Sequence, residues 1–115
     1  MRSGARTPEE LDALLEDAFI VRDRQAVGAL FENEALVVDA AGEARGARQI
    51  ADWATETWKR GVTYVAAESR VLQAGDTALV LTPKGIGVAR RHDDRAWRYA
   101  IALLSVAHTP TKEEQ

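Results

Sequence analysis

The sequence predicts an α+β domain in which three N-terminal helices pack on a bent antiparallel sheet. In the first half of the chain, apolar residues recur at helical spacing. In the second half, short apolar segments alternate with turns, at the spacing of an antiparallel meander. With 115 residues, 46% of them hydrophobic, the chain is expected to form one domain. Its core is predicted at about 8–106, with loose tails at 1–6 and 108–115.

Two helices are predicted at the start of this domain. Thr7 is the expected N-cap of the first, Pro8 takes the first helical position, and Glu10 completes a capping box. This helix runs to about Arg22, and its apolar face consists of Leu11, Leu14, Leu15, Ala18 and Phe19. Asp23 then caps a short second helix, whose buried side is formed by Ala26, Val27, Leu30 and Phe31.

A strand, a turn and a third helix are expected next. The segment 36–38 is too apolar to be exposed on both faces, and 40–43 forms a turn in which Gly42 takes a positive φ. The third helix covers about 47–60, and Gly61 caps its C-terminus. Its apolar side consists of Ile50, Trp53, Ala54, Thr57 and Trp58.

The second half is predicted to be strands only, at 62–73, 77–82, 86–92 and 97–106. The strands at 77–82 and 97–106 carry apolar residues on both faces, and one layer of helices covers only one face of a sheet. We therefore expect a homodimer that buries the outer face of the sheet.

Composition excludes several classes of protein. The net charge is -3, without the basic surplus of a nucleic-acid-binding surface. No cysteine is present, which removes disulfides and thiolate metal sites, and no apolar segment approaches the ~20 residues of a transmembrane helix. The N-terminus lacks the apolar core of a signal peptide, so we expect a cytoplasmic protein. Arginine outnumbers lysine twelve to three, which is typical of a G+C-rich bacterial genome.

In order and spacing, four segments resemble the NTF2-like superfamily, and more narrowly its small bacterial SnoaL-like and ketosteroid-isomerase-like proteins. They are DAFIVRDRQAVGALF (17–31), ALVVDAAGEARGARQI (35–50), VLQAGDTALVL (71–81) and WRYAIALLS (97–105). The resemblance covers about 8–106 and implies a cone-shaped, cystatin-like domain with a pocket at its open end. Members of the superfamily include isomerases, polyketide cyclases, epoxide hydrolases, dehydratases and proteins without catalysis, so the fold alone does not decide function.

The resemblance places Asp39 at the position of the general base of the isomerases. A base that abstracts a proton next to a carbonyl needs a carboxylate whose pKa is raised by apolar surroundings. Tyr64 or Tyr99 is the candidate donor to the enolate. The alternative is structural: Asp39 forms an Asx-turn and accepts the N–H groups of Ala41 and Gly42.

The expected pocket lies between the first and third helices and the concave face of the sheet. Its candidate lining residues are Leu15, Phe19, Trp53, Trp58 and Ala102, with Asp39 and Tyr64 at the wall. Leu15 stands where isomerases carry an oxyanion-hole tyrosine, and Ala102 stands where many SnoaL-like proteins have an acid. The hairpin at 82–85 is also shorter than the hairpin that is usual at this place in the superfamily. For the tryptophans the alternative is an ordinary place in the core.

Other polar residues give weaker indications of a functional site. His92 beside Asp93 and Asp94 suggests either an acid–base couple or a solvated turn. A group of arginines either binds an anionic ligand or forms a solvated surface together with Asp93, Asp94 and Glu68. These arginines are Arg90, Arg91, Arg95 and Arg98. No cluster has the spacing of metal ligands, and neither a metal nor a cofactor is expected.

Two functions remain open at this point. The first is a SnoaL-like domain that binds a hydrophobic small molecule, in its catalytic form an isomerase- or cyclase-type enzyme of secondary metabolism with Asp39 as base. The second is a non-catalytic dimerisation or ligand-sensing module with a degenerate pocket. An open cavity of ~300 Å³ or more with Asp39 at its wall favours the first, and a filled pocket favours the second.

Overall fold

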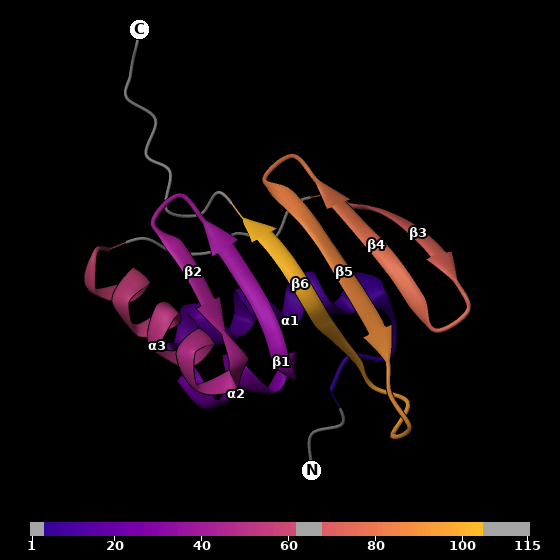
Figure 1. Ribbon diagram of the computed structural model, residues 1–115, viewed down its shortest axis with the longest axis horizontal. Coiled ribbons are helices and arrows are strands. Elements are labelled where there is room, and N and C mark those ends of the chain that lie inside the picture. Colours follow the sequence, from indigo (N-terminus) through magenta and orange to yellow (C-terminus); the bar gives the residue numbers. More distant parts are fainter. Residues whose placement is uncertain (1–3, 62–67, 105–115) are drawn as a thin grey trace, which may run out of the picture.

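The computed structural model describes residues 4–61 and 68–104 and confirms the α+β fold, with helices packed on a bent sheet (Figure 1). The helices and strands are α1 (Pro8–Val21), α2 (Arg24–Ala29), β1 (Phe31–Asp39), β2 (Gly42–Arg45), α3 (Gly46–Lys59), β3 (Arg70–Ala74), β4 (Thr77–Thr82), β5 (Gly85–Arg91) and β6 (Trp97–Leu104). The predicted strand at 62–73 is described only in its second part, and Tyr64 lies outside the described residues.

The six strands form one sheet in the order β2-β1-β6-β5-β4-β3 (Figure 1). All neighbouring pairs are antiparallel except β1 and β6, which run parallel, with Leu36 opposite Ile101. This parallel pair joins an N-terminal hairpin to a C-terminal meander, and a local sequence pattern does not reveal it. The strand β2 was not predicted, since 40–43 was expected to be a turn and in this short strand only Ala44 is buried.

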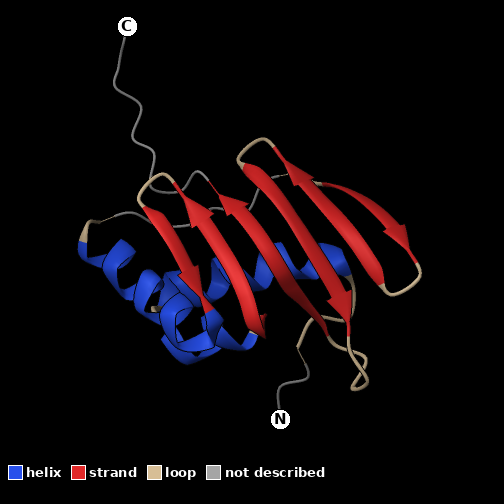
Figure 2. Ribbon diagram, in the orientation of Figure 1, coloured by secondary structure: helices blue, strands red, loops and turns tan. Residues whose placement is uncertain are grey.

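The helices cover one face of the sheet, as Figure 2 shows. Helix α1 packs on β6 and β4, whereas α3 packs on β1 and β2. The core between these layers contains Leu11, Leu15 and Phe19 from α1, Val27 from α2, Ile50 and Ala54 from α3, and Val37, Ala78, Tyr99 and Ala102 from the sheet.

Side-chain caps fix where the first two helices begin. The Thr7 hydroxyl accepts the N–H of Glu10, and the Glu10 carboxylate accepts the N–H of Arg6, 2.7 Å away, rather than that of Thr7 itself. Asp23 accepts the N–H of Ala26 at 3.0 Å. The Thr7 and Asp23 contacts satisfy amides that the first turn of a helix leaves without partners.

The outer face of the sheet carries apolar side chains that none of the helices among the described residues covers. Cross-strand pairing sets Leu72 beside Leu79 and Ile86 beside Leu103. Five large apolar residues on this face are 38–46% exposed, and we call them the outer apolar face: Leu72, Leu79, Ile86, Ile101 and Leu103. A contiguous apolar surface of this kind is typical of an interaction site. The homodimer through this face stays a prediction.

Candidate functional site

A small cavity lies between α1 and the inner face of strands β4, β5 and β6. Water-sized spheres fit in only about 10 Å³ of it, which is room for about one water molecule. We call it the inner cavity, and its lining includes three of the predicted site residues, Leu15, Tyr99 and Ala102. The other lining residues are Asp12, Val80, Thr82, Gly85, Ile86, Gly87 and Leu104.

Asp12 is the residue of this cavity that the sequence analysis missed. It lies on α1 one turn before Leu15, and only 4% of its surface is exposed. Burial of a carboxylate carries a large desolvation cost, which hydrogen bonds or charged partners have to offset. A signal was present in the sequence, because Pro8, Asp12, Leu15 and Phe19 recur at helical spacing on one buried stripe.

Tyr99 faces Asp12 from the sheet and is held on several sides. Its ring packs against that of Phe31 with centroids 5.4 Å apart, and its N–H donates to the carbonyl of Leu30 at 2.9 Å. A Cβ placed on Gly87 would lie only 2.7 Å from Tyr99 Cε1, so the missing side chain at Gly87 makes room for the ring. Burial, and to a lesser extent the charge of Asp12, raises the pKa of the Tyr99 phenol well above its ordinary value.

Asp39 makes a different set of contacts from those of a pocket base. Its Oδ1 accepts the N–H groups of Ala41 at 2.8 Å and Gly42 at 3.2 Å, which is the Asx-turn of the structural alternative. Its Oδ2 accepts the indole N–H of Trp53 at 2.6 Å. One carboxylate oxygen therefore stabilises the β1–β2 turn, and the other connects this turn to α3. Asp39 is not among the residues that line the inner cavity.

The expected aromatic lining residues pack on one another instead of around this cavity. Phe19 makes edge contacts with Trp53 and Trp58, with ring centroids 5.6 and 5.4 Å apart. Phe19 and Trp58 are buried, whereas Trp53 is half-buried. The Nε1 of Trp58 is buried and has no hydrogen-bond acceptor among the described residues. This cluster fits the interpretation of the tryptophans as core residues.

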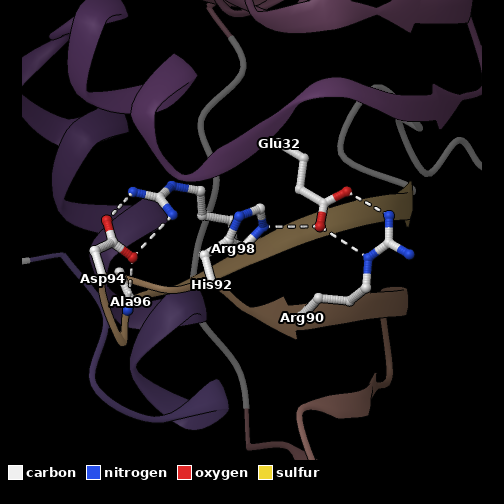
Figure 3. A network of polar contacts seen from close by, with 6 residues as sticks. All are labelled: Glu32, Arg90, His92, Asp94, Ala96 and Arg98. Atoms are coloured by element: carbon white, nitrogen blue, oxygen red, sulfur yellow. Dashed lines mark hydrogen bonds and ion pairs between the residues drawn. The ribbon is translucent and has the colours of Figure 1, made fainter.

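His92 pairs with a residue that the sequence analysis did not consider. Its Nε2 lies 2.9 Å from the Glu32 carboxylate, which also accepts two hydrogen bonds from Arg90, at 2.6 and 2.8 Å (Figure 3). The hydrogen bond from Arg90 is the main cause that lowers the pKa of Glu32. The expected couple of His92 with Asp93 or Asp94 is therefore replaced by a contact across the sheet, between β1 and the end of β5.

Most of the predicted arginine group is paired with carboxylates. Arg91 pairs with Asp76, and Arg98 makes a two-pronged contact with Asp94 at 2.7 and 3.2 Å (Figure 3). Hydrogen bonds from Arg98 and from the N–H of Ala96 lower the pKa of Asp94 to about 2. These pairs support the interpretation as a charged solvated surface, although Asp76 and Glu32 are not the partners that were expected.

Within residues 4–61 and 68–104, no three His, Asp or Glu side chains gather as metal ligands would. No helix in the same part of the chain has the length and apolarity needed to cross a membrane.

Solved structures with the same fold are numerous, although their sequences are distant. A protein of unknown function with a cystatin-like fold from Nostoc punctiforme superimposes with a TM-score of 0.74 at 16% identity, over 89% of this chain and 88% of that one. An NTF2-like protein from Novosphingobium aromaticivorans gives 0.71 at 17% identity, over 90% and 81%. A ketosteroid isomerase-like protein from Erwinia carotovora atroseptica gives 0.66 at 14% identity, over 88% and 94%.

By sequence alone, the chain matches no family model and no curated protein. The superpositions establish the fold, whereas sequence identities this low leave the activity open. The chain has the cystatin-like fold of the NTF2-like and ketosteroid-isomerase-like proteins, as the resemblance of its sequence implied.

Proposed function

We propose that this chain is a small-molecule-binding domain whose ligand meets Asp12 and Tyr99 in the inner cavity. The observation that carries the proposal is a buried carboxylate that faces a buried phenol across a cavity on the inner face of the sheet. Together they offer one hydrogen-bond acceptor and one donor in apolar surroundings. Ligand sites are typically apolar recesses that contain a small number of polar groups. Such a site suits a flat apolar molecule with one hydroxyl or carbonyl group.

The size of the cavity limits how such a ligand enters. Room for about one water molecule means that a larger ligand displaces side chains at the rim. Leu104 lies on the same face of β6 as Ala102 and is only half-buried, so its side chain has space to move. The rim also includes Thr82 and Gly85, the ends of the short β4–β5 hairpin.

In a catalytic version of this function, Asp12 replaces Asp39 as the base. Its carboxylate would take a proton from the carbon next to a carbonyl, and the electron pair of the broken C–H bond would move to the carbonyl oxygen. The Tyr99 hydroxyl would donate a hydrogen bond to that oxygen. The Tyr99 phenol is suited to this role by its position, because it lines the same cavity as Asp12.

Binding by the inner cavity is testable with 2-naphthol, a flat aromatic molecule with a single hydroxyl group, by isothermal titration calorimetry. We expect saturable binding that Asp12→Asn and Tyr99→Phe each weaken by about tenfold, through loss of a buried hydrogen bond. Asp17→Asn is the matched control, because Asp17 is an exposed acid on the same helix. If the natural chain does not bind, or if Asp17→Asn loses as much affinity, the proposal is wrong. Thermal unfolding of each variant separates a loss of binding from a loss of folding.

A second candidate function, a non-catalytic dimerisation module, is favoured by the outer apolar face together with the small cavity. In this proposal two copies bury Leu72, Leu79, Ile86, Ile101 and Leu103 against each other. Sedimentation equilibrium at micromolar concentration should give a dimer. Leu79→Asp should give a monomer, because a charge is costly to bury, while Ile20→Asp on the exposed side of α1 should leave the dimer intact. A monomeric natural chain would rule out this assembly.

A further inference from the structure

An open groove lies between α2, α3 and the beginning of β1, and none of the described residues that line it also lines the inner cavity. Water-sized spheres occupy about 730 Å³ of it, which is within the range of small-molecule sites. Three arginines line it, each from a different element: Arg24 on α2, Arg48 on α3 and Arg98 on β6. We call it the arginine groove. Among residues 4–61 and 68–104, no acid belongs to its lining, although acids outnumber bases in the whole chain.

The groove is hollow because its walls carry small side chains. Gly28 and Ala29 on α2 face Ala47 and Ala51 on α3. The two helices lie close together here, since a Cβ on Gly28 would be 3.5 Å from the carbonyl oxygen of Ala47. Phe31 gives the groove an apolar contact surface. The groove is therefore lined by small residues together with three long arginine side chains.

Two of the arginines are held in place by partners beside the groove. Arg24 donates to Asp52 at 2.9 Å and to Thr55 at 3.2 Å, and Arg98 is held by Asp94. A guanidinium has five N–H donors, so each keeps donors for a further acceptor. Fixed arginines lose less side-chain freedom when they bind a ligand.

Arg48 is the arginine that leaves the groove positively charged. It is exposed, and no carboxylate within residues 4–61 and 68–104 pairs with it. Asp52 and Asp94 offset the charges of Arg24 and Arg98, which leaves one unbalanced positive charge. The amides of Gln25 and Asn33 add neutral hydrogen-bond donors. The N-terminal turn of α3 carries no acidic residue, so its dipole adds to the positive potential.

We propose that the arginine groove binds a small oxyanion that carries more than one negative charge on phosphate or carboxylate groups. Three guanidinium groups around one hollow suit such an ion, because arginine binds both groups with paired hydrogen bonds. The groove has the volume of a small-molecule site, and a net charge of -3 disfavours an extended polyanion such as a nucleic acid. This site is independent of the ligand proposed for the inner cavity.

Isothermal titration with pyrophosphate and with citrate, at low and constant ionic strength, tests the proposal. We expect saturable binding of at least one of them, weakened about tenfold by Arg48→Gln, as the loss of a charge-assisted hydrogen bond implies. Arg60→Gln is the matched control, because Arg60 is also exposed and lies at the opposite end of α3. Both positions are on the surface, so neither variant should impair folding.

The outcomes separate the kinds of ligand. Binding of pyrophosphate alone indicates a phosphate-selective groove, citrate alone a carboxylate-selective one, and both together recognition by charge. In each case the backbone amide signals of Gly28, Ala47 and Ala51 should shift in a ¹⁵N–¹H NMR titration. The proposal is overturned if neither anion saturates, if Arg60→Gln weakens binding as much as Arg48→Gln, or if the shifts scatter over all exposed arginines.

Discussion

Gly87→Ala tests how tightly the sheet holds Tyr99 over the inner cavity. The added Cβ would lie 2.7 Å from Tyr99 Cε1 and 3.1 Å from Cδ1, whereas carbon atoms in contact prefer about 3.5–4.0 Å. The ring must therefore retreat by roughly 0.8 Å. Phe31 packs against it, and Tyr99 is only 4% exposed, so little space is available.

The magnitude follows from two opposing terms. Overpacking of a core costs about 1–3 kcal/mol. Alanine in place of glycine restricts the unfolded chain and returns about 0.4–1 kcal/mol. We expect a net loss of about 1–2 kcal/mol, which lowers the melting temperature of a domain of this size by roughly 5–10 °C.

Urea unfolding, followed by tryptophan fluorescence at one fixed protein concentration, measures this loss. Gly28→Ala is the control, because its Cβ would meet its nearest neighbour at an ordinary 3.5 Å. That variant should be neutral or stabilising, since alanine is the better helix residue. In a Tyr99→Leu background, Gly87→Ala should lose most of its effect. If Gly87→Ala is as stable as the natural chain, the ring is not confined as the structure indicates.

Three further predictions concern stability. Gly85→Ala should lower the free energy of unfolding in urea by about 3 kcal/mol or more, because its Cβ would lie 1.9 Å from the carbonyl oxygen of Leu103, a main-chain atom that cannot rotate away. A loss under about 1 kcal/mol would contradict this prediction. Asp39→Asn should cost about 1–3 kcal/mol by depriving the Trp53 N–H of its acceptor, and much less once Trp53 is phenylalanine; equal losses in both backgrounds would refute this. The pKa of Glu32 is lowered in the folded state, so its contribution to the free energy of unfolding is complete above its ordinary pKa of 4.5 and is lost as the pH falls through the lowered value. Glu32→Gln should therefore flatten the acid side of a profile of stability against pH, and an unchanged profile would count against this.

The fold could be predicted because its signals are local. Thr7 and Asp23 cap the helices at which they were expected, and apolar periodicity located all three helices. The strand β2 and the parallel pairing of β1 with β6 escaped prediction. The first is short and mostly exposed, and the second joins segments whose relation depends on the whole topology.

The candidate site was predictable only in part. Leu15, Tyr99 and Ala102 do line one cavity. Asp39 and Trp53 were both expected at the pocket, but they bond to each other and hold a turn to a helix, and neither lines that cavity. Asp12 was overlooked although its helical stripe marks it, because the helix face was read from apolar residues alone. The contact of His92 with Glu32 spans the sheet, and nothing in the neighbourhood of either residue in the sequence points to it.

The parallel pairing of β1 with β6 also bears on how the chain folds. The hairpin β1–β2 and the meander β3–β5 are each made of neighbours in sequence, but only β6 joins them into one sheet. Because β6 follows all other described strands in the chain, the sheet closes only after the rest has been synthesised. Contacts between such distant segments slow folding, since the loop between them must be closed first. Until then, the apolar inner edges of both halves lack a neighbour, which makes the interval before β6 docks the stage most prone to aggregation.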